Sequence, residues 1–280
     1  MIKARSASPR RYSHAQDRVR PSAAPCPHHC HGQGVSSSSD LLADAQDDRW
    51  TLGVAVSVRD SPYVGEGTRV RPLPLVTFDG QRFFWRGLSG GIHLIQRKSL
   101  SIDAVLSGRF DGFDIKDLSR AGLARNGLDD AALEDRDDAL DAGLAASWRG
   151  RAGELKVSAL ADVTDASGGY EFAVDYGYAL QWGRTTVVPG AGVRWMSKDL
   201  VNYYYGTLDE EISRGVAPYR PGSALVPQVS VGFSRPLGEK WRVLGGVDYK
   251  FLPNELADSP LLEPDSNGSA AVRLGISRSF

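Results

Sequence analysis

The chain has 280 residues, of which 41% are hydrophobic and 24% charged, and its net charge is −1. This near-zero charge argues against nucleic acid as the main partner. The sequence holds no run of about 18 apolar residues, which excludes a transmembrane helix, whereas β-strands of about 9–11 alternating residues could still cross a bilayer. The two cysteines, Cys26 and Cys30, lie near the start, which excludes a disulfide framework for the rest of the chain.

Residues 1–49 differ in composition from the remainder. They are basic, rich in Ser and Pro and almost free of aliphatic residues, which predicts disorder. No apolar core of about 7–15 residues follows the basic residues, as a secretory or twin-arginine signal would require. If the rest of the chain lies in an outer membrane, a signal is required, and we then expect that the start is misassigned or that a leader is missing. The CPHHCH stretch at 26–31 has ligand types that suit zinc or copper, but its spacing matches no standard finger, and a biased tail is the preferred interpretation.

From Trp50 onward, large apolar residues alternate with small, glycyl or charged ones, as in strands with two different faces. The predicted strands cover residues 50–60, 69–79, 81–87, 90–97, 99–108, 138–149, 152–163, 169–182, 184–196, 223–235, 239–251 and 269–280. Connections after even-numbered strands are short, and the long ones, at 109–137, 197–222 and 252–268, follow odd-numbered strands. Transmembrane barrels have short periplasmic turns, longer external loops and an even strand number.

We therefore predict an all-β fold, a transmembrane antiparallel up-and-down β-barrel of about 12 strands over residues 50–280, with ten strands as an alternative. A soluble barrel or sandwich would also alternate. The aromatic residues favour the membrane, because they gather at strand ends like the girdles of outer-membrane barrels, at Trp50, Tyr170, Trp182, Trp195, Trp241 and Phe280.

The other strand face is predicted to line the lumen with charges of both signs. Its members are Arg59, Arg69, Arg71, Glu171, Asp175, Arg184, Arg194, Arg242, Asp248 and Arg273. A lumen of about twelve strands is narrow compared with the 16–18-stranded porins. The mixed charges could cross-link and close it, although a small pore remains an alternative.

Three further groups of residues are candidate functional sites. Aromatic and Arg side chains in one long loop suit a binding surface, although packing into the barrel mouth is preferred: Tyr203, Tyr204, Tyr205, Arg214, Tyr219 and Arg220. An acidic cluster within 129–138 could bind a divalent cation, but it lacks EF-hand spacing, so a solvated loop face is preferred. His93 is the one histidine of residues 50–280 and has no partner motif for hydrolysis. We expect no catalytic residue, metal or cofactor.

Several stretches resemble the MipA/OmpV family of outer-membrane proteins. They are SPYVGEGTRVRPLPLVTFDGQRFFWRG at 61–87, LEDRDDALDAGL at 133–144, DSPLL at 258–262 and, most specifically, NYYYGTLDEEISRGVAPYRPG at 202–222. The resemblance implies a barrel in the bacterial outer membrane, in contact with its lipid, and no catalytic residue set. One branch of the family resembles a scaffold that joins a murein transglycosylase to a murein synthase.

The chain ends in the alternating strand AAVRLGISRSF at 270–280. Its apolar face carries Val272, Leu274, Ile276 and Phe280, and in a closed barrel this strand pairs with the first. A terminal aromatic residue on such a strand resembles the signal recognised by the barrel-insertion machinery. Arg278 falls on the same apolar face, where its side chain could snorkel to the interface. The sequence thus favours a non-enzymatic envelope scaffold, with a narrow solute channel as the alternative and a hydrolase as a weaker one.

Overall fold

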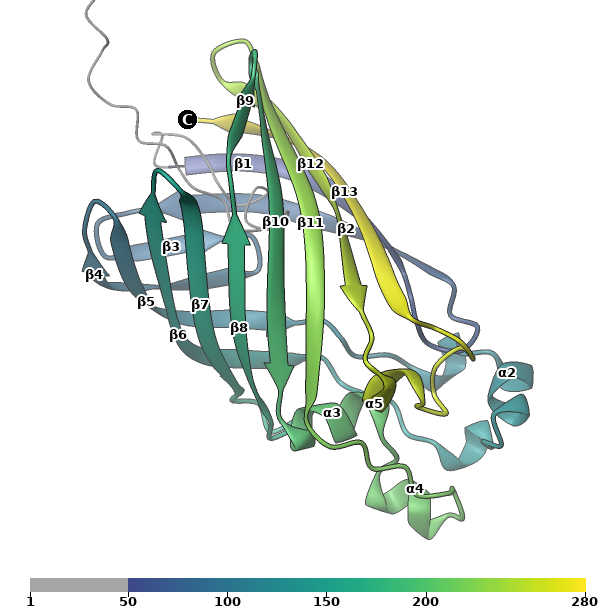
Figure 1. The fold of residues 1–280 in the computed structure, drawn as a ribbon. Coiled ribbons are helices and arrows are strands. Elements are labelled where there is room, and N and C mark those ends of the chain that lie inside the picture. Colours follow the sequence, from purple (N-terminus) through teal and green to yellow (C-terminus); the bar gives the residue numbers. More distant parts are fainter. Residues whose placement is uncertain (1–49) are drawn as a thin grey trace, which may run out of the picture. The chain divides into compact units, whose positions relative to one another are not determined.

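The computed structural model describes residues 50–280, so the predictions for residues 1–49 lie outside the described residues. In this part of the chain one antiparallel sheet closes on itself (Figure 1). Its strands are β1 (Trp50–Asp60), β2 (Thr68–Asp79), β3 (Phe83–Arg86), β4 (Ser89–Gln96), β5 (Leu100–Arg109), β6 (Ala139–Gly150), β7 (Gly153–Asp162), β8 (Tyr170–Gly177), β9 (Leu180–Trp182), β10 (Thr185–Met196), β11 (Ala224–Leu237), β12 (Trp241–Phe251) and β13 (Gly268–Ser279).

The thirteen strands of the described residues form twelve staves, because β8 and β9 both pair with β10 and share one position in the wall. The circle closes where β13 pairs with β1, from Thr51 opposite Ser279 to Arg59 opposite Ala271. Beyond that ladder the backbone N–H of Phe280 donates to the Trp50 carbonyl at 3.0 Å. The predicted twelve-stranded antiparallel barrel is confirmed.

The wall has an apolar outside and a polar inside. In β1 the outward residues Trp50, Leu52, Val54 and Val56 are exposed, whereas the residues between them are buried or half-buried. A continuous exposed belt of Val, Leu, Ile and aromatic side chains is far larger than the patches that soluble monomers carry. Such a belt is stable against lipid hydrocarbon. No helix within residues 50–280 is long and apolar enough to cross a bilayer.

Aromatic pairs mark both ends of this belt. Trp50 and Phe78 pack with ring centroids 4.6 Å apart at the end where the short turns lie. At the opposite end the Trp195 ring packs 5.7 Å from Tyr170 and 5.8 Å from Phe172. Rings at these two levels suit the two headgroup regions of a membrane.

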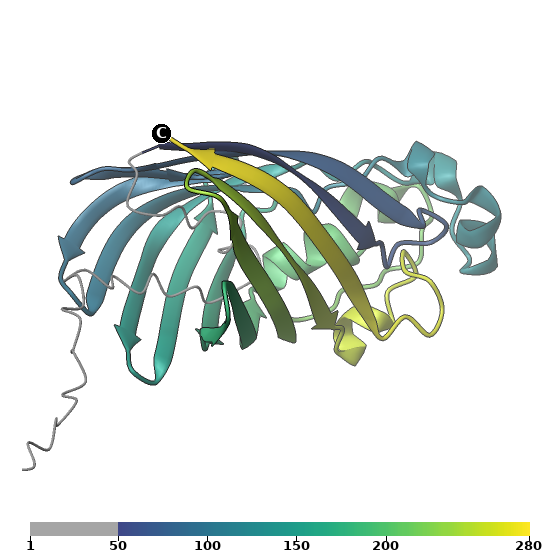
Figure 2. The ribbon, with the colours of Figure 1, turned by 90° about the horizontal axis from the view of Figure 1, so that it is seen from above.

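All the long connections lie at one end of the barrel, which we call the loop end, and the short turns lie at the turn end (Figures 1 and 2). The loop end carries α2 (Arg120–Arg125), α3 (Lys198–Tyr205), α4 (Asp209–Ser213), α5 (Asn254–Ala257) and the 3-10 turns η1 (Ile115–Asp117) and η2 (Asp130–Ala132). We name residues 61–67, 110–138, 197–223 and 252–267 the cap. Its apolar core contains the fully buried Val64, Leu123, Leu200, Leu256 and Leu261.

Candidate functional site

The barrel encloses a cavity of about 700 Å³. Eight of the ten charges predicted for the lumen line it: Arg59, Arg69, Arg71, Glu171, Asp175, Arg194, Asp248 and Arg273. Arg184 and Arg242 do not. Arg184 is exposed in the tight turn between β9 and β10, because β10 begins one residue later, at Thr185. Arg242 lies near the turn end, where its Nη1 donates to Ser234 Oγ at 2.9 Å.

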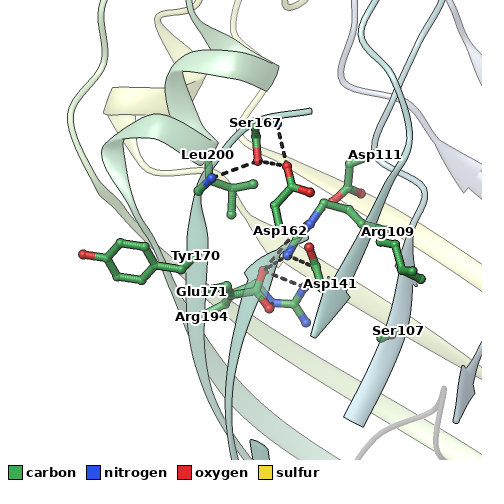
Figure 3. A network of polar contacts seen from close by, with 12 residues as sticks. Ser107, Arg109, Asp111, Asp141, Asp162, Ser167, Tyr170, Glu171, Arg194 and Leu200 are labelled. Carbon is green, nitrogen blue, oxygen red and sulfur yellow. Dashed lines mark hydrogen bonds and ion pairs between the residues drawn. The ribbon is translucent and has the colours of Figure 1, made fainter. Parts of the chain in front are cut away.

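A buried ionic network crosses the lumen close to the loop end (Figure 3). Arg109, the last residue of β5, places Nη2 2.6 Å from Asp141 of β6 and Nη1 3.1 Å from Glu171 of β8. Arg194 of β10 approaches the other oxygen of Glu171 with its Nε, at 3.4 Å. Arg109, Asp141 and Glu171 are each less than one-tenth exposed. Charges this buried are held in place by their mutual pairing, so the network links β5, β6, β8 and β10, four of five consecutive strands of the wall.

Only Glu171 and Arg194 of this network were predicted as lumen charges. Arg109 falls one residue past the predicted end of its strand, at 108. Asp141 lies within the predicted strand 138–149 but was not among the predicted lumen charges. The alternation with Leu140 and Ala142 predicts the inner face for Asp141, but nothing in the sequence indicates that Asp141 pairs with Arg109.

Asp111 lies just beyond the network, in the first residues of the cap. Arg59 Nη1 is 3.8 Å and Arg109 Nη1 is 3.4 Å from its carboxylate. Burial alone would raise the pKa of Asp111, but the cations of Lys250, Arg109, Arg59 and Arg194 outweigh it and hold the pKa well below its usual range. The carboxylate is therefore a permanent negative charge among these bases.

The lumen narrows from this level toward the loops. A second cavity of only about 50 Å³ shares Arg59, Arg109 and Asp111 with the large one and is bounded on the other side by Tyr63 and Tyr205 of the cap. Burial raises the pKa of both tyrosine hydroxyls, so both stay neutral. The Tyr63 hydroxyl donates to the carbonyl of Tyr204 at 3.2 Å.

One fully buried ion pair joins two loops of the cap. Arg136 binds both carboxylate oxygens of Glu211, with Nη1 at 2.9 Å and Nη2 at 3.0 Å, and neither side chain is exposed at all. The guanidinium also donates to the backbone carbonyls of Glu134, Tyr203 and Gly206. Every N–H group of the Arg136 guanidinium therefore has an acceptor. These bonds hold the two loops against each other.

The residues predicted as a loop surface differ in their exposure to solvent. Tyr204 is wholly buried and its hydroxyl donates to the Asp137 carbonyl at 3.1 Å, so it packs the cap. Tyr203 and Tyr205 are half-buried, as is Tyr219, whose hydroxyl donates to the Glu255 carbonyl at 3.0 Å. Two arginines remain exposed, each paired with a carboxylate of the cap: Arg214 with Glu134 and Arg220 with Asp209.

Two carboxylates of the acidic cluster in the loop after β5 accept hydrogen bonds from backbone N–H groups. Asp135 accepts from the Ile115 N–H at 2.6 Å, and Asp138 accepts from the Gly112 N–H at 3.0 Å. Over residues 50–280 no three His, Cys, Asp or Glu side chains form a metal-ligand group.

His93 lies on the lumen side near the turn end, between two carboxylates. Its Nδ1 is 2.7 Å from Asp103 and its Nε2 is 3.4 Å from Asp79. Within the described residues no hydroxyl bonds to either ring nitrogen. The two carboxylates and the imidazole therefore form a polar cluster on the inner face of the wall.

Several known proteins are similar to this chain. MltA-interacting protein of Escherichia coli (strain K12) is 30% identical over 250 residues, which are 88% of this chain and 96% of the relative. Outer membrane protein Omp26La of Vibrio anguillarum is 24% identical over 70% of this chain and 86% of its own length. Among solved structures, the NanC porin aligns with 82% of this chain and all of its own, with a TM-score of 0.46 and 10% identity. Residues 52–280 match the family described as MltA-interacting protein MipA. The chain therefore belongs to the MipA/OmpV family of β-barrels and lies in the bacterial outer membrane.

Proposed function

We propose that this barrel is a non-enzymatic, non-conducting scaffold that binds a murein transglycosylase at its periplasmic end, with a murein synthase as a further partner. The observation that carries the proposal is the closure of the lumen at the loop end. There the network of Arg109, Asp141 and Glu171 lies beneath a cap with its own apolar core. A barrel sealed in this way presents surfaces to partners and offers no through-path for solutes.

The turn end has a charge pattern that suits such a partner. Short turns are periplasmic in outer-membrane barrels. Every short turn at this end of the described wall carries at least one exposed basic residue, and we name them the basic rim: Arg82, Arg97, Lys98, Arg151, Arg184 and Lys240. The exposed acidic residues there are Asp79 and Glu239. A positive surface of this kind steers an acidic face of a periplasmic protein into place.

The name of one relative, MltA-interacting protein, supports the choice of a murein transglycosylase as the partner. A direct test measures binding of the murein transglycosylase of the same organism to the purified barrel in detergent. The charge reversal R97E/K98E should weaken binding at low salt, whereas K116E/K198E, which reverses two exposed charges at the loop end, should leave it unchanged. Equal affinity of the transglycosylase for wild type and both variants would refute a role of the basic rim in binding. No binding to wild type would refute the scaffold function.

A narrow channel is the second candidate, because the cavity of about 700 Å³ is lined by nine basic and seven acidic side chains. Planar-bilayer recordings separate the two functions. The closed lumen should give no steady ion steps. Steps in wild type that change with Glu171→Gln would establish the channel and overturn the non-conducting scaffold.

A further inference from the structure

The wall of the barrel is incomplete beside β2. β3 is only four residues long and pairs with β2 over Thr77–Asp79 alone. The next contact is a backbone bond from the Gly87 N–H to the Val76 carbonyl at 3.0 Å. From there toward the loops, residues 68–75 of β2 pair with β1 on one side and with no strand of the described residues on the other.

The sequence of β2 is adapted to this free edge. In an antiparallel strand the N–H and C=O of one residue point to the same neighbour. Since the Val76 carbonyl points toward β3, the backbone groups of Pro74 and Pro72, two and four residues earlier, point into the same gap. Proline has no N–H, so both positions lack the donor that would stand unpaired in a membrane.

The lining of the large cavity shows that it reaches this gap. On complete staves the lining residues alternate, as at Lys156, Ser158 and Leu160, because only one strand face looks inward. At the gap the lining is continuous, over 71–75 in β2, 86–89 at the β3–β4 turn and 107–111 at the end of β5 and just beyond it. A cavity that touches both faces of a strand passes around its edge. We name this opening the side window.

The side window has an apolar rim and a basic interior. Leu88 and Phe110 on the rim are each 41% exposed, and Pro72 and Pro74 are exposed beside them. It spans residues 71–75 of β2, about 13 Å from the first to the last at about 3.3 Å per residue. It ends toward the loops where Arg71 Nη1 donates to the Phe110 carbonyl at 3.0 Å.

The charges inside the window are mainly positive. Arg71 is the first inward residue beyond the rim, and β1 places Arg59 directly opposite Arg69 on the adjoining strand. Lys250 also lines the cavity and forms no ion pair with another described residue. The nearby carboxylates Glu66 and Asp111 offset only part of this charge.

We propose that the side window admits an amphipathic anion from the membrane, a molecule with one acyl chain and a carboxylate or phosphate headgroup. The chain lies across the rim of Pro72, Pro74, Leu88 and Phe110, and the headgroup lies inside against Arg71. A volume of about 700 Å³ falls within the usual range of about 300–1,000 Å³ for small-molecule sites. This inference is independent of the scaffold function, because it concerns the wall and not the turn end.

The test uses a fatty acid with a mid-chain diazirine, irradiated with the full-length barrel in detergent and mapped by mass spectrometry. Adducts should concentrate at 71–75, 86–89 and 107–111. Leu88→Trp should lower their yield several-fold by filling the window, whereas Leu106→Trp, which adds the same bulk to the lipid face of β5, should not. Heat-modifiability gels confirm that each variant is folded.

The headgroup is tested separately. Arg71→Gln should reduce the adduct yield at least about tenfold, as expected for a lost charge-assisted hydrogen bond, and Arg71→Lys should retain most of it. Competition by unlabelled palmitate or lysophosphatidic acid decides between carboxylate and phosphate. Adducts spread evenly over the outer belt, equal yields for Leu88→Trp and Leu106→Trp, or an equally efficient amine-headed probe would each overturn the proposal.

Discussion

The cap should open when its buried ion pair is broken. Arg136→Met leaves the Glu211 carboxylate, which has no exposure to solvent, with only the backbone N–H groups of Glu134 and Leu208 as partners. Breaking a buried pair by removing one member costs about 3–5 kcal/mol. The loss of three further hydrogen bonds from Arg136 to carbonyls places the variant toward the upper end of that range.

The measurement is hydrogen exchange of cap amides in the purified barrel. A loss of about 3–5 kcal/mol lowers protection by roughly a hundred- to several-thousand-fold, up to the full opening free energy of the cap. The strands should keep their protection, because their ladder hydrogen bonds do not depend on the cap. Arg120→Met is the matched control, since Arg120 is 86% exposed in its pair with Asp130 and such surface pairs contribute about 0–1 kcal/mol.

Two results would refute this reasoning. Unchanged protection in the cap of the Arg136→Met variant would show that the pair does not hold the loops. Loss of protection throughout the barrel would show that the cap is not a separate cooperative unit. The double variant R136M/E211M removes both charges and should recover part of the loss, because no unpaired carboxylate stays buried.

Three further predictions concern other parts of the molecule. Phe280→Ala should lower the yield of heat-modifiable barrel several-fold, and Phe251→Ala, at an exposed aromatic position of β12, should not; equal yields would deny the terminal residue a special role. Arg278→Leu should change the free energy of unfolding by no more than about 1 kcal/mol, since Arg278 lies near the interface over the Phe280 ring, and a larger change in denaturant titration would contradict the interfacial placement. The cations around Asp111 hold its pKa low despite burial, so its contribution to stability is complete above about pH 4 and is lost as the pH falls further. Acid should therefore destabilise wild type more than Asp111→Asn, and parallel acid titrations would contradict this.

The wall could be predicted from the sequence because pleating imposes a period of two on any strand that separates lipid from a polar lumen. The residues of β1, β8, β10 and β12 follow that period closely, so their inner and outer faces were assigned without the structure. Arg184 shows the limit of the method. A boundary shifted by one residue moved it from the lumen into a turn, where Gly183 has a φ of +61°.

The cap could not be predicted in the same way, because its contacts join residues far apart in the chain. Arg136 and Glu211 are 75 residues apart, and Arg109 and Glu171 are 62 apart. Each belongs to a loop or strand end that is plainly polar in composition. No periodicity distinguishes a charge that will be buried in a pair from one that will remain in solvent. Aromatic residues have the same limit, because Tyr204 is buried between two half-buried tyrosines and no pattern in the sequence distinguishes it from them.

The side window lies between these two cases. Pro72 and Pro74 keep the alternation of β2, since both face outward between inward Arg71, Leu73 and Leu75, so the pattern alone reads as an ordinary stave. Proline inside a strand nevertheless indicates an edge, and a closed barrel has no edges unless its wall is interrupted. The RPLPL stretch and the short strand that follows it are therefore the sequence features that correspond to the interruption, although the predicted strand over 69–79 did not include one. The two prolines tolerate an opening at membrane depth because they remove the donors that lipid could not satisfy.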